Sequence, residues 1–248
     1  MNKILEVENL KKVYHTKNEE IEAISDVSFD LKEGDFIAIV GPSGCGKSSI
    51  LNIICGLDKD YKGEILINGN KNIGYMLQND ALFNFRTILN NCLIGLEIQN
   101  NLTNENKEYV NQLLDTYGLK DFKNSYPTSL SGGMKQRVAL IRTLATKPDI
   151  LILDEPFSAL DYQTRLAVSD DVYKIIKNEK KSVIMVTHDI AEAISLANKV
   201  IVLTNRPCVI KNIYEINFTN RSNPTQNRKA DEFSYYYEKI WKDIDAHV

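Results

Sequence analysis

The sequence predicts an α/β fold in which a buried parallel sheet positions the functional residues. Short, almost wholly apolar strands predict such a sheet, because strands covered on both faces have few polar positions. These strands lie within residues 36–40, 149–156, 182–189 and 199–207. A glycine-rich stretch joins the first of them to a predicted helix over residues 48–57. Residues 79–130 have helical periodicity instead, which predicts a helical subdomain inserted into the α/β core.

The composition is that of an ordinary globular protein with little net charge. Of the 248 residues, 43% are hydrophobic and 25% are charged, and the formal net charge is −3. This balance provides no basic field to attract nucleic acid, so we expect no nucleic-acid partner. No apolar run reaches the roughly 20 residues of a membrane-spanning helix, and no signal peptide is expected. The four cysteines include no CxxC pair, which argues against a zinc site or a disulfide framework and favours a reducing compartment.

The stretch GPSGCGKS, from Gly41 to Ser48, has the residue types and the spacing of a phosphate-binding loop. Its glycines permit a close approach and backbone angles that side chains would prevent, so successive N–H groups can point at phosphate oxygens. Lys47 supplies a cation for the β- and γ-phosphates, and the Ser48 hydroxyl can bind Mg²⁺. The dipole of the following helix also favours an anion. The alternative, a glycine-rich turn without a ligand, is disfavoured by the flanking strand and helix.

The remaining strands of the first half have weaker patterns. Residues 3–10 alternate between apolar and polar types, which predicts an edge strand with one buried face. Further strands are expected over residues 23–31, 63–70 and 72–77. Gly56 is the expected C-cap of the helix after the phosphate loop. Taken alone, Tyr14 is explained by packing in the core and Gln78 by a solvated turn at a strand end, so neither residue by itself indicates a function.

The helical block has one clear apolar face. It is formed by Val110, Leu113, Leu114 and Tyr117. Ahead of this helix, Phe83 and Phe85 are expected in the core, as most aromatic side chains are.

The sequence LSGGMKQRVAL predicts a small flexible turn followed by a helix that runs to about Ala145. The turn is Ser131-Gly132-Gly133, and the N-terminus of its helix is a second candidate anion site. Taken alone, the same three residues are also common in ordinary loops.

Two acidic residues end the apolar strand within residues 149–156. Asp154 would face the crevice where α/β sheets bind ligands, and there it is the expected Mg²⁺ anchor of a phosphate-loop protein. Glu155 could orient or deprotonate an attacking water molecule. His188 follows the strand within residues 182–189 and is expected at the same edge of the sheet.

The C-terminal part contains fewer functional signals. Residues 209–218 predict a last strand or hairpin, and the polar residues 220–230 predict a loop. A final helix is expected to pack on the domain by one apolar face. That face consists of Phe233, Tyr237, Ile240, Trp241 and Ile244.

The order of these motifs resembles the ATP-binding subunit of ABC transporters, and the resemblance extends from Leu5 to about Pro207. The matching motifs are the phosphate loop, a Gln at a strand end, LSGG, LDE, LD and His. The resemblance implies a phosphate-loop ATPase core with a parallel sheet, an N-terminal antiparallel β subdomain and an inserted helical subdomain. Residues 1–248 would then form a single ATP-binding domain. Its helical subdomain would span about 79–145, and its C-terminal loop and helix about 220–248.

The resemblance also implies roles for individual residues. Tyr14 would stack on adenine, and Ser131, Gly132 and Gly133 would bind the γ-phosphate of ATP held by another subunit. The triphosphate would be held by Gly41, Pro42, Ser43, Gly44, Cys45, Gly46, Lys47, Ser48 and Ser49. The residues implied for Mg²⁺ are Ser48, Gln78 and Asp154. The residues implied for catalysis and for the dimer interface are Glu155 as general base, Gln78 beside the attacking water, His188 at the γ-phosphate and Asp161 across the interface.

The partners follow from the same resemblance. Two copies would trap two ATP molecules between each phosphate loop and the opposing LSGG turn. ATP hydrolysis would open this dimer and drive membrane permease subunits, and through them act with a solute-binding protein. The chain would therefore lie at the cytoplasmic face of the cell membrane as a peripheral protein.

Finer features are similar to the importers of nitrate, sulfonates and taurine, a branch that also includes carriers of pyrimidine precursors. These features are NIGYMLQNDALFNFRTILNNC, LSGGMKQRVALIRTL, DEPFSALD and VLTNRP. The sequence departs from that branch at Asn84-Phe85, where Pro-Trp is usual, and at Ser49, where Thr is commoner. Two alternatives remain at this point, a nucleotide switch in DNA repair or on ribosomes and the motor of an exporter. The DNA-repair switch is disfavoured, because in such proteins a long coiled coil separates the two nucleotide-binding motifs. Here only about 107 residues separate Lys47 from Asp154, and no heptad run lies between them.

Overall fold

The computed structural model describes residues 2–15 and 19–245, which form two compact units. Unit 1 contains residues 1–71 and 181–248, and unit 2 contains residues 72–180. Unit 2 is therefore wider than the helical subdomain expected over 79–145. Among the described residues, no helix is both long and apolar enough to cross a membrane.

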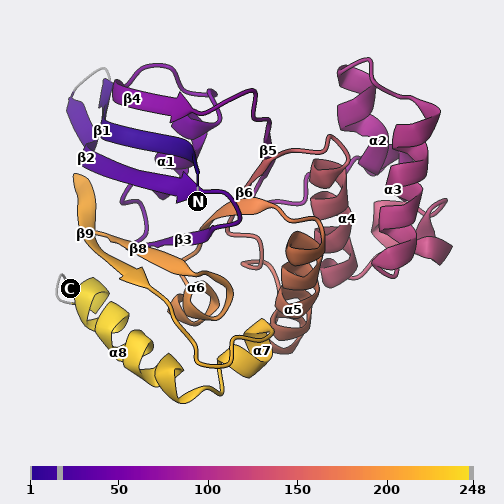
Figure 1. The fold of residues 1–248 in the computed structure, drawn as a ribbon. Coiled ribbons are helices and arrows are strands. Elements are labelled where there is room, and N and C mark those ends of the chain that lie inside the picture. Colours follow the sequence, from indigo (N-terminus) through magenta and orange to yellow (C-terminus); the bar gives the residue numbers. More distant parts are fainter. Residues whose placement is uncertain (1, 16–18, 246–248) are drawn as a thin grey trace. The chain divides into compact units, whose positions relative to one another are not determined.

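Unit 1 is built on a twisted sheet whose strands run in the order β4-β1-β2-β9-β8-β3-β7 (Figure 1). The strands are β1 (Lys3–His15), β2 (Glu20–Lys32), β3 (Phe36–Val40), β4 (Lys62–Ile67), β7 (Ser182–Val186), β8 (Lys199–Leu203) and β9 (Cys208–Glu215). The helices are α1 (Lys47–Ile54), α6 (Ile190–Leu196), α7 (Pro224–Asn227) and α8 (Asp231–Asp245). Strands β8, β3 and β7 are parallel, and every residue in them is buried, as their apolar sequences predict.

The N-terminal part of unit 1 is an antiparallel subdomain, in agreement with the expected fold class. Strand β1 pairs with β2 on one side and with β4 on the other. The prediction of an edge strand over residues 3–10 is therefore wrong, since β4 occupies that edge. Alternation reports which face of a strand is buried, but it does not report how many neighbours the strand has.

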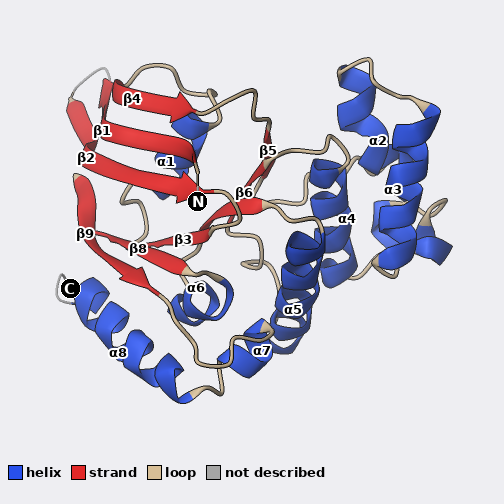
Figure 2. Ribbon diagram, in the orientation of Figure 1, coloured by secondary structure: helices blue, strands red, loops and turns tan. Residues whose placement is uncertain are grey.

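Unit 2 contains two parallel strands and a group of packed helices (Figure 2). The elements are β5 (Ile73–Met76), β6 (Ile150–Asp154), α2 (Ile88–Ile98), α3 (Asn104–Thr116), α4 (Gly132–Leu144) and α5 (Tyr162–Asn178), with 3₁₀ turns at Lys120–Phe122 and Pro127–Ser129. Helix α4 contacts α2, α3 and α5. The predicted apolar face of α3 is confirmed for Val110, Leu113 and Leu114, which are buried, but Tyr117 is the C-cap that follows the helix and is only half-buried.

Two aromatic side chains of unit 2 contradict their expected placement in the core. The exposed fractions of Phe83 and Phe85 are 40% and 76%, and their ring centroids lie 5.5 Å apart. The pair precedes α2, where Asn91 takes the buried position: its side chain accepts from the Phe83 N–H at 2.7 Å and donates to the Phe83 carbonyl at 3.1 Å. Hydrogen bonds between the Asn91 side chain and the Phe83 backbone therefore hold the segment before α2, and burial of the two rings does not.

Helix ends follow the expected chemistry, with differences at the end of α1 and in the C-terminal region. The C-cap of α1 is Cys55 and not Gly56 as predicted; Gly56 follows it with a φ of +71°, the left-handed conformation that commonly ends a helix one residue after its C-cap. The predicted loop over 220–230 contains the short helix α7, because Asn223 caps its N-terminus and Pro224 occupies its first turn. In α8, Ile240 is fully buried, but Trp241 is 50% exposed, so the expected apolar face covers the domain only in part.

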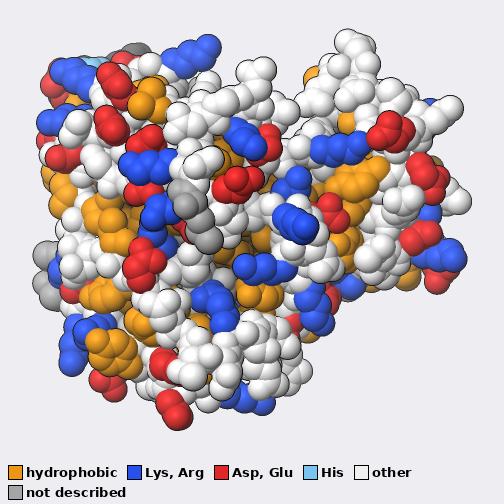
Figure 3. All heavy atoms as spheres, viewed as in Figure 1, with side chains coloured by type: hydrophobic (Ala, Val, Ile, Leu, Met, Phe, Trp, Pro, Cys, Tyr) orange, Lys and Arg blue, Asp and Glu red, His pale blue; other side chains and the backbone are white. Residues whose placement is uncertain are grey.

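Charged side chains of both signs are interspersed over the face shown in Figure 3, in keeping with the small net charge. The four cysteines all lie in the described residues and form no disulfide with one another, and Cys45, Cys92 and Cys208 are buried.

Candidate active site

The phosphate loop leaves the end of β3 and enters α1, as the sequence predicts. Gly44 and Gly46 have φ angles of +73° and +122°, which a residue with a side chain rarely adopts. Lys47 is buried, and its Nζ donates to the carbonyls of Gly41 at 2.8 Å and Pro42 at 2.9 Å. The loop thus curls around its own lysine, whose ammonium can exchange these carbonyls for phosphate oxygens.

Cys45 lies inside the loop with its thiol covered. Burial raises the pKa of Cys45, and the nearby cation of Lys47 offsets part of this effect. Because its ordinary value is 9.0, the thiol is neutral at pH 7. Cys45 therefore acts as a small apolar residue of the loop and not as a nucleophile.

Tyr14, which is implied to stack on adenine, is anchored to the start of α1. Its hydroxyl lies 2.8 Å from the Ser49 hydroxyl, and 39% of its side chain is exposed. Lys12 approaches the ring, with Nζ 4.8 Å from the ring centroid, while it binds the carboxylates of Asp58 and Asp60. Sequence reasoning missed Lys12; its position two residues before Tyr14, on the same face of β1, was the available signal.

His188 lies at the same edge of unit 1 as the phosphate loop. Strands β3 and β7 are parallel with Ile39 opposite Val186, so the segments that follow both strands leave the sheet together. The turn after β7 is fixed by Thr187, whose hydroxyl donates to the Glu192 carboxylate at 2.7 Å and accepts from the Asp189 N–H at 3.0 Å. His188 itself is exposed beside this fixed turn.

The acidic residues and Gln78 come together at one edge of unit 2. Strands β5 and β6 are parallel with Met76 opposite Leu153, so Gln78 and Glu155 follow at the same edge. The Gln78 amide Nε2 donates to Glu155 Oε2 at 3.3 Å. Glu155 has a φ of +44°, a conformation that costs a side-chain-bearing residue about 1–3 kcal/mol and often occurs at functional sites.

Asp154 is buried one residue before Glu155, and the Tyr75 hydroxyl donates to its carboxylate at 3.2 Å. Sequence reasoning did not single out Tyr75; its place in β5 beside the strand that carries Asp154 was the only signal. The bond holds the Asp154 carboxylate in a defined orientation.

The LSGG turn and Asp161 both cap helices of unit 2. The Ser131 hydroxyl accepts from the Met134 N–H at 3.4 Å, and the Asp161 carboxylate accepts from the Thr164 N–H at 3.1 Å. Bonds from the Thr164 hydroxyl and N–H hold the pKa of Asp161 below its ordinary value. Ser131 and Asp161 are exposed, so both helix N-termini are accessible to solvent.

The candidate residues thus fall into two groups, one in each unit. Unit 1 brings together the loop from Gly41 to Ser49, Tyr14 and His188. Unit 2 brings together Gln78, Asp154 and Glu155 at one edge and carries the exposed caps Ser131 and Asp161 at the starts of α4 and α5.

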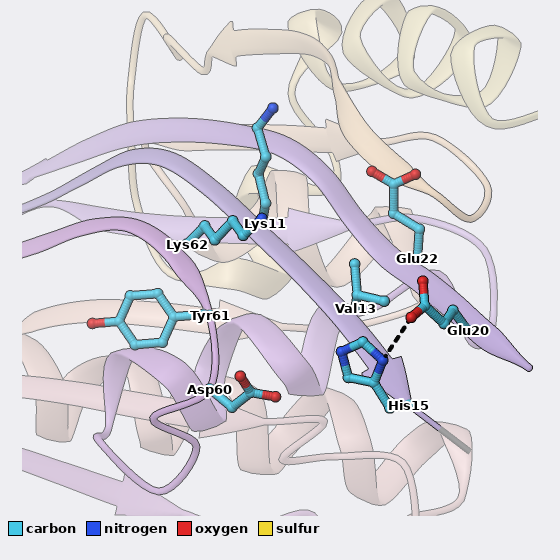
Figure 4. A pocket seen from close by; sticks show the side chains of 8 residues that line it. All are labelled: Lys11, Val13, His15, Glu20, Glu22, Asp60, Tyr61 and Lys62. Atoms are coloured by element: carbon cyan, nitrogen blue, oxygen red, sulfur yellow. Dashed lines mark hydrogen bonds and ion pairs between the residues drawn. The ribbon is translucent and has the colours of Figure 1, made fainter. Parts of the chain in front are cut away.

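A separate pocket of about 430 Å³ lies on the antiparallel subdomain (Figure 4). Its lining includes Lys11, Val13 and His15 of β1, and His15 Nδ1 lies 3.1 Å from the Glu20 carboxylate. Tyr14 falls between Val13 and His15, so its side chain points to the other face of β1. The pocket is therefore on the face of the strand opposite the Tyr14–Ser49 contact.

The family to which these motifs point is decided by comparison with known proteins. The sequence model of the family described as "ABC transporter" matches residues 24–158, more than half of the chain. The chain belongs to the ABC transporter family. Its ABC domain is that of an ATPase.

Similar ABC proteins align along nearly the whole chain. A Bacillus subtilis protein named "Uncharacterized ABC transporter ATP-binding protein YtlC" is 42% identical over 98% of this chain and 96% of its own. The aliphatic sulfonates import ATP-binding protein of Bacillus thuringiensis is 36% identical and covers 88% of each chain. The taurine and nitrate import ATP-binding proteins of Roseobacter denitrificans and Synechocystis are also 36% identical, over 95% of this chain and at least 92% of theirs.

A solved ABC structure has the same fold. The ATP-binding cassette MJ0796, a dimer bound to ADP and phosphate in a post-hydrolysis state, superposes with a TM-score of 0.73 and 31% identity. The alignment covers 86% of this chain and 99% of that one. The predicted α/β ABC ATPase fold is confirmed.

Proposed function

We propose that this chain is the ATP-hydrolysing subunit of an importer that takes up a small polar or anionic solute. The main observation is the pairing of Gln78 with Glu155 directly after Asp154, in a chain that also carries a phosphate loop closed on Lys47. The similarity to import ATP-binding proteins for sulfonates, taurine and nitrate supports the direction of transport and the class of solute.

Binding of ATP is assigned to unit 1. The loop N–H groups and Lys47 hold the phosphates, and the Tyr14 ring, fixed by Ser49, receives the adenine. His188 reaches the γ-phosphate from the turn after β7. Hydrogen-bond donors and a cation suit the negatively charged triphosphate, and an aromatic ring suits the flat adenine base.

Hydrolysis is assigned to unit 2. Glu155 accepts the proton of the attacking water, and the Gln78 amide bound to it orients the carboxylate and the water. The Tyr75 hydroxyl holds the Asp154 carboxylate in a defined orientation at the edge that also carries Gln78 and Glu155, and this carboxylate is the group assigned to the cation.

The oxygen donors assigned to Mg²⁺ fit that ion. They are the Ser48 hydroxyl, the Gln78 side-chain carbonyl and the Asp154 carboxylate, all hard ligands of the type Mg²⁺ prefers. When bound, Mg²⁺ neutralises charge on the β- and γ-phosphates. Ser48 lies in α1 of unit 1, whereas Gln78 and Asp154 lie at the ends of the paired strands β5 and β6 of unit 2.

Assembly as an ATP-sandwiched homodimer is part of the proposal. The accessible N-termini capped by Ser131 and Asp161 would meet the γ-phosphate held by the second copy, because helix N-termini attract anions. The dimer would act on membrane permease subunits at the cytoplasmic face of the membrane, and through them on a solute-binding protein.

The experiment that tests import starts from native membranes. Tagged Glu155→Gln protein with ATP is used to capture partners from detergent-solubilised membranes, and mass spectrometry identifies them. We expect a multi-span permease together with a solute-binding lipoprotein; the same capture with Lys47→Ala is the control. Recovery of a ribosome or a DNA-repair complex would contradict the importer, and a permease without any binding protein would favour an exporter.

A further inference from the structure

We propose that Arg206 is a positioning residue of the phosphate loop, which it holds from outside in the conformation that binds nucleotide. The proposal rests on the assignment of residues 41–48 as the nucleotide site. Arg206 is exposed and lies between β8 and β9, and its Nη2 donates to the carbonyl of Gly44 at 2.7 Å. The two residues are 162 positions apart in the sequence, so this contact exists only in the folded unit.

The fold brings the β8–β9 turn beside the loop. Strands β3 and β8 are parallel with Val40 opposite Val202, so the chain leaves both strands at the same edge. The turn is closed by two hydrogen bonds, from the Thr204 N–H to the Val209 carbonyl and from the Val209 N–H to the Thr204 hydroxyl, both 3.0 Å long. The backbone that carries Arg206 is therefore fixed at both sides.

Three glycines of the loop, Gly41, Gly44 and Gly46, lie next to this turn or to the residues that flank it. Arg206 contacts the middle one, Gly44. A Cβ atom on Gly41 would lie 3.1 Å from the Leu203 Cβ, and one on Gly46 would lie 3.4 Å from the Cys208 Sγ. The backbone at Gly41 and at Gly46 thus lies close to the residues that flank the turn, and at Gly44 the contact is the charged hydrogen bond from Arg206. The glycines thus serve packing against the turn as well as the backbone angles of the loop.

The bond from Arg206 fixes the orientation of the peptide group that joins Gly44 to Cys45. The Gly44 carbonyl and the Cys45 N–H belong to one planar peptide, so a donor that holds the carbonyl also fixes the direction of the N–H. A charged donor makes this bond stronger than a neutral one. The guanidinium also adds positive charge beside the loop, which favours a polyphosphate. Arg206 should therefore control nucleotide affinity and leave the hydrolytic step unchanged.

The affinity for ADP separates a positioning role from a direct contact with the γ-phosphate. The loop backbone cradles the α- and β-phosphates, which ADP and ATP share. A residue that positions the loop should affect both nucleotides by the same factor. A residue that binds the γ-phosphate should affect ATP alone.

The test measures the dissociation constants of MgADP and MgATP by calorimetry on the full chain, with Glu155→Gln present for ATP. We expect Arg206→Ala to weaken both by about tenfold, as loss of a charge-assisted hydrogen bond predicts. Arg206→Lys should recover most of the affinity, and Arg206→Gln should recover less because it lacks the charge. Without Glu155→Gln, KM should rise by a similar factor while kcat stays within about twofold.

The matched control is Lys211→Ala, which removes a cation of β9 that donates to the Asp243 carbonyl at 2.7 Å, away from the loop. Its affinity should equal that of the unmodified protein. Suppose that Lys47→Ala has lost nucleotide binding. The positioning role of Arg206 would then be overturned if Arg206→Ala bound both nucleotides with unchanged affinity, or if it lost affinity for MgATP alone. Unchanged affinity of Lys47→Ala would overturn the nucleotide-site assignment, and the role of Arg206 with it.

Discussion

The phosphate loop of unit 1 and the carboxylate edge of unit 2 are built in opposite ways. The loop is held by backbone groups: Lys47 binds two of its own carbonyls, and the β8–β9 turn supports it from outside. The carboxylate edge is instead held between side chains, and its bonds include one from Gln78 to Glu155 and one from Tyr75 to Asp154. Under the proposed function, binding therefore depends on a shaped main chain, and hydrolysis depends on oriented side chains.

This difference predicts which changes separate binding from chemistry. The largest separation is expected for Glu155→Gln, which retains the shape of the side chain but removes its basicity. We expect kcat to fall by about 10²–10⁴-fold, the range of general acid–base catalysis, with MgATP affinity preserved. Steady-state hydrolysis and nucleotide binding measure the two effects. Glu105→Gln, at an exposed ion pair of the same unit, is the control, and an unchanged kcat in Glu155→Gln would remove the general-base role.

The complementary change in unit 1 is Lys47→Ala. We expect the dissociation constant of MgATP to rise by roughly 10- to 100-fold, since hydrogen bonds of a charged group contribute about 1.5–3 kcal/mol. The loop would also lose its two internal bonds to Lys47. Calorimetry measures the affinity, with Lys211→Ala as the charge control. Wild-type affinity would show that the two regions do not divide binding and chemistry as proposed.

A third change tests packing behind the LSGG turn. Gly133 is buried, and a Cβ on it would lie 2.7 Å from the Val168 Cγ2 of α5. Gly133→Ala should therefore lower the free energy of unfolding by about 1–3 kcal/mol, as overpacking does. Denaturant unfolding measures the change, and Val168→Ala in the same protein should restore part of it. Equal stability of Gly133→Ala and the unmodified protein would show that α4 and α5 can move apart without cost.

The smallest effect concerns pH at the Asp161 cap. The pKa of Asp161 is lowered below its ordinary value of 3.8 in the folded state, so the carboxylate stabilises the fold above that value. This contribution is lost as the pH falls through the lowered pKa. Thermal unfolding of the unmodified protein and Asp161→Ala should differ at pH 7 and converge as the pH falls through the lowered pKa of Asp161. A difference that persists unchanged to low pH would show that the charge of Asp161 does not stabilise α5.

The motifs that lie within one short segment were predictable from the sequence. The loop from Gly41 to Ser48, the apolar strands and the acidic pair at the end of β6 depend on residue type and spacing, which can be read directly from the sequence. The predictions that were wrong concern which residues or strands pack beside one another in the fold. Strand β1 has partners on both sides, and Phe83 and Phe85 lie at the surface because Asn91 occupies the buried position.

The sequence by itself determined the fold class, the family and the residues that we propose to bind and hydrolyse ATP, because each is encoded in local patterns of glycine, charge and apolar spacing. Only the tertiary structure decided which distant residues support them: Tyr75 on Asp154, Ser49 on Tyr14 and Arg206 on Gly44. These contacts join positions separated by 35 to 162 residues, and strand order and register bring them together. Local patterns do not record strand order, since any strand of suitable composition could be the neighbour.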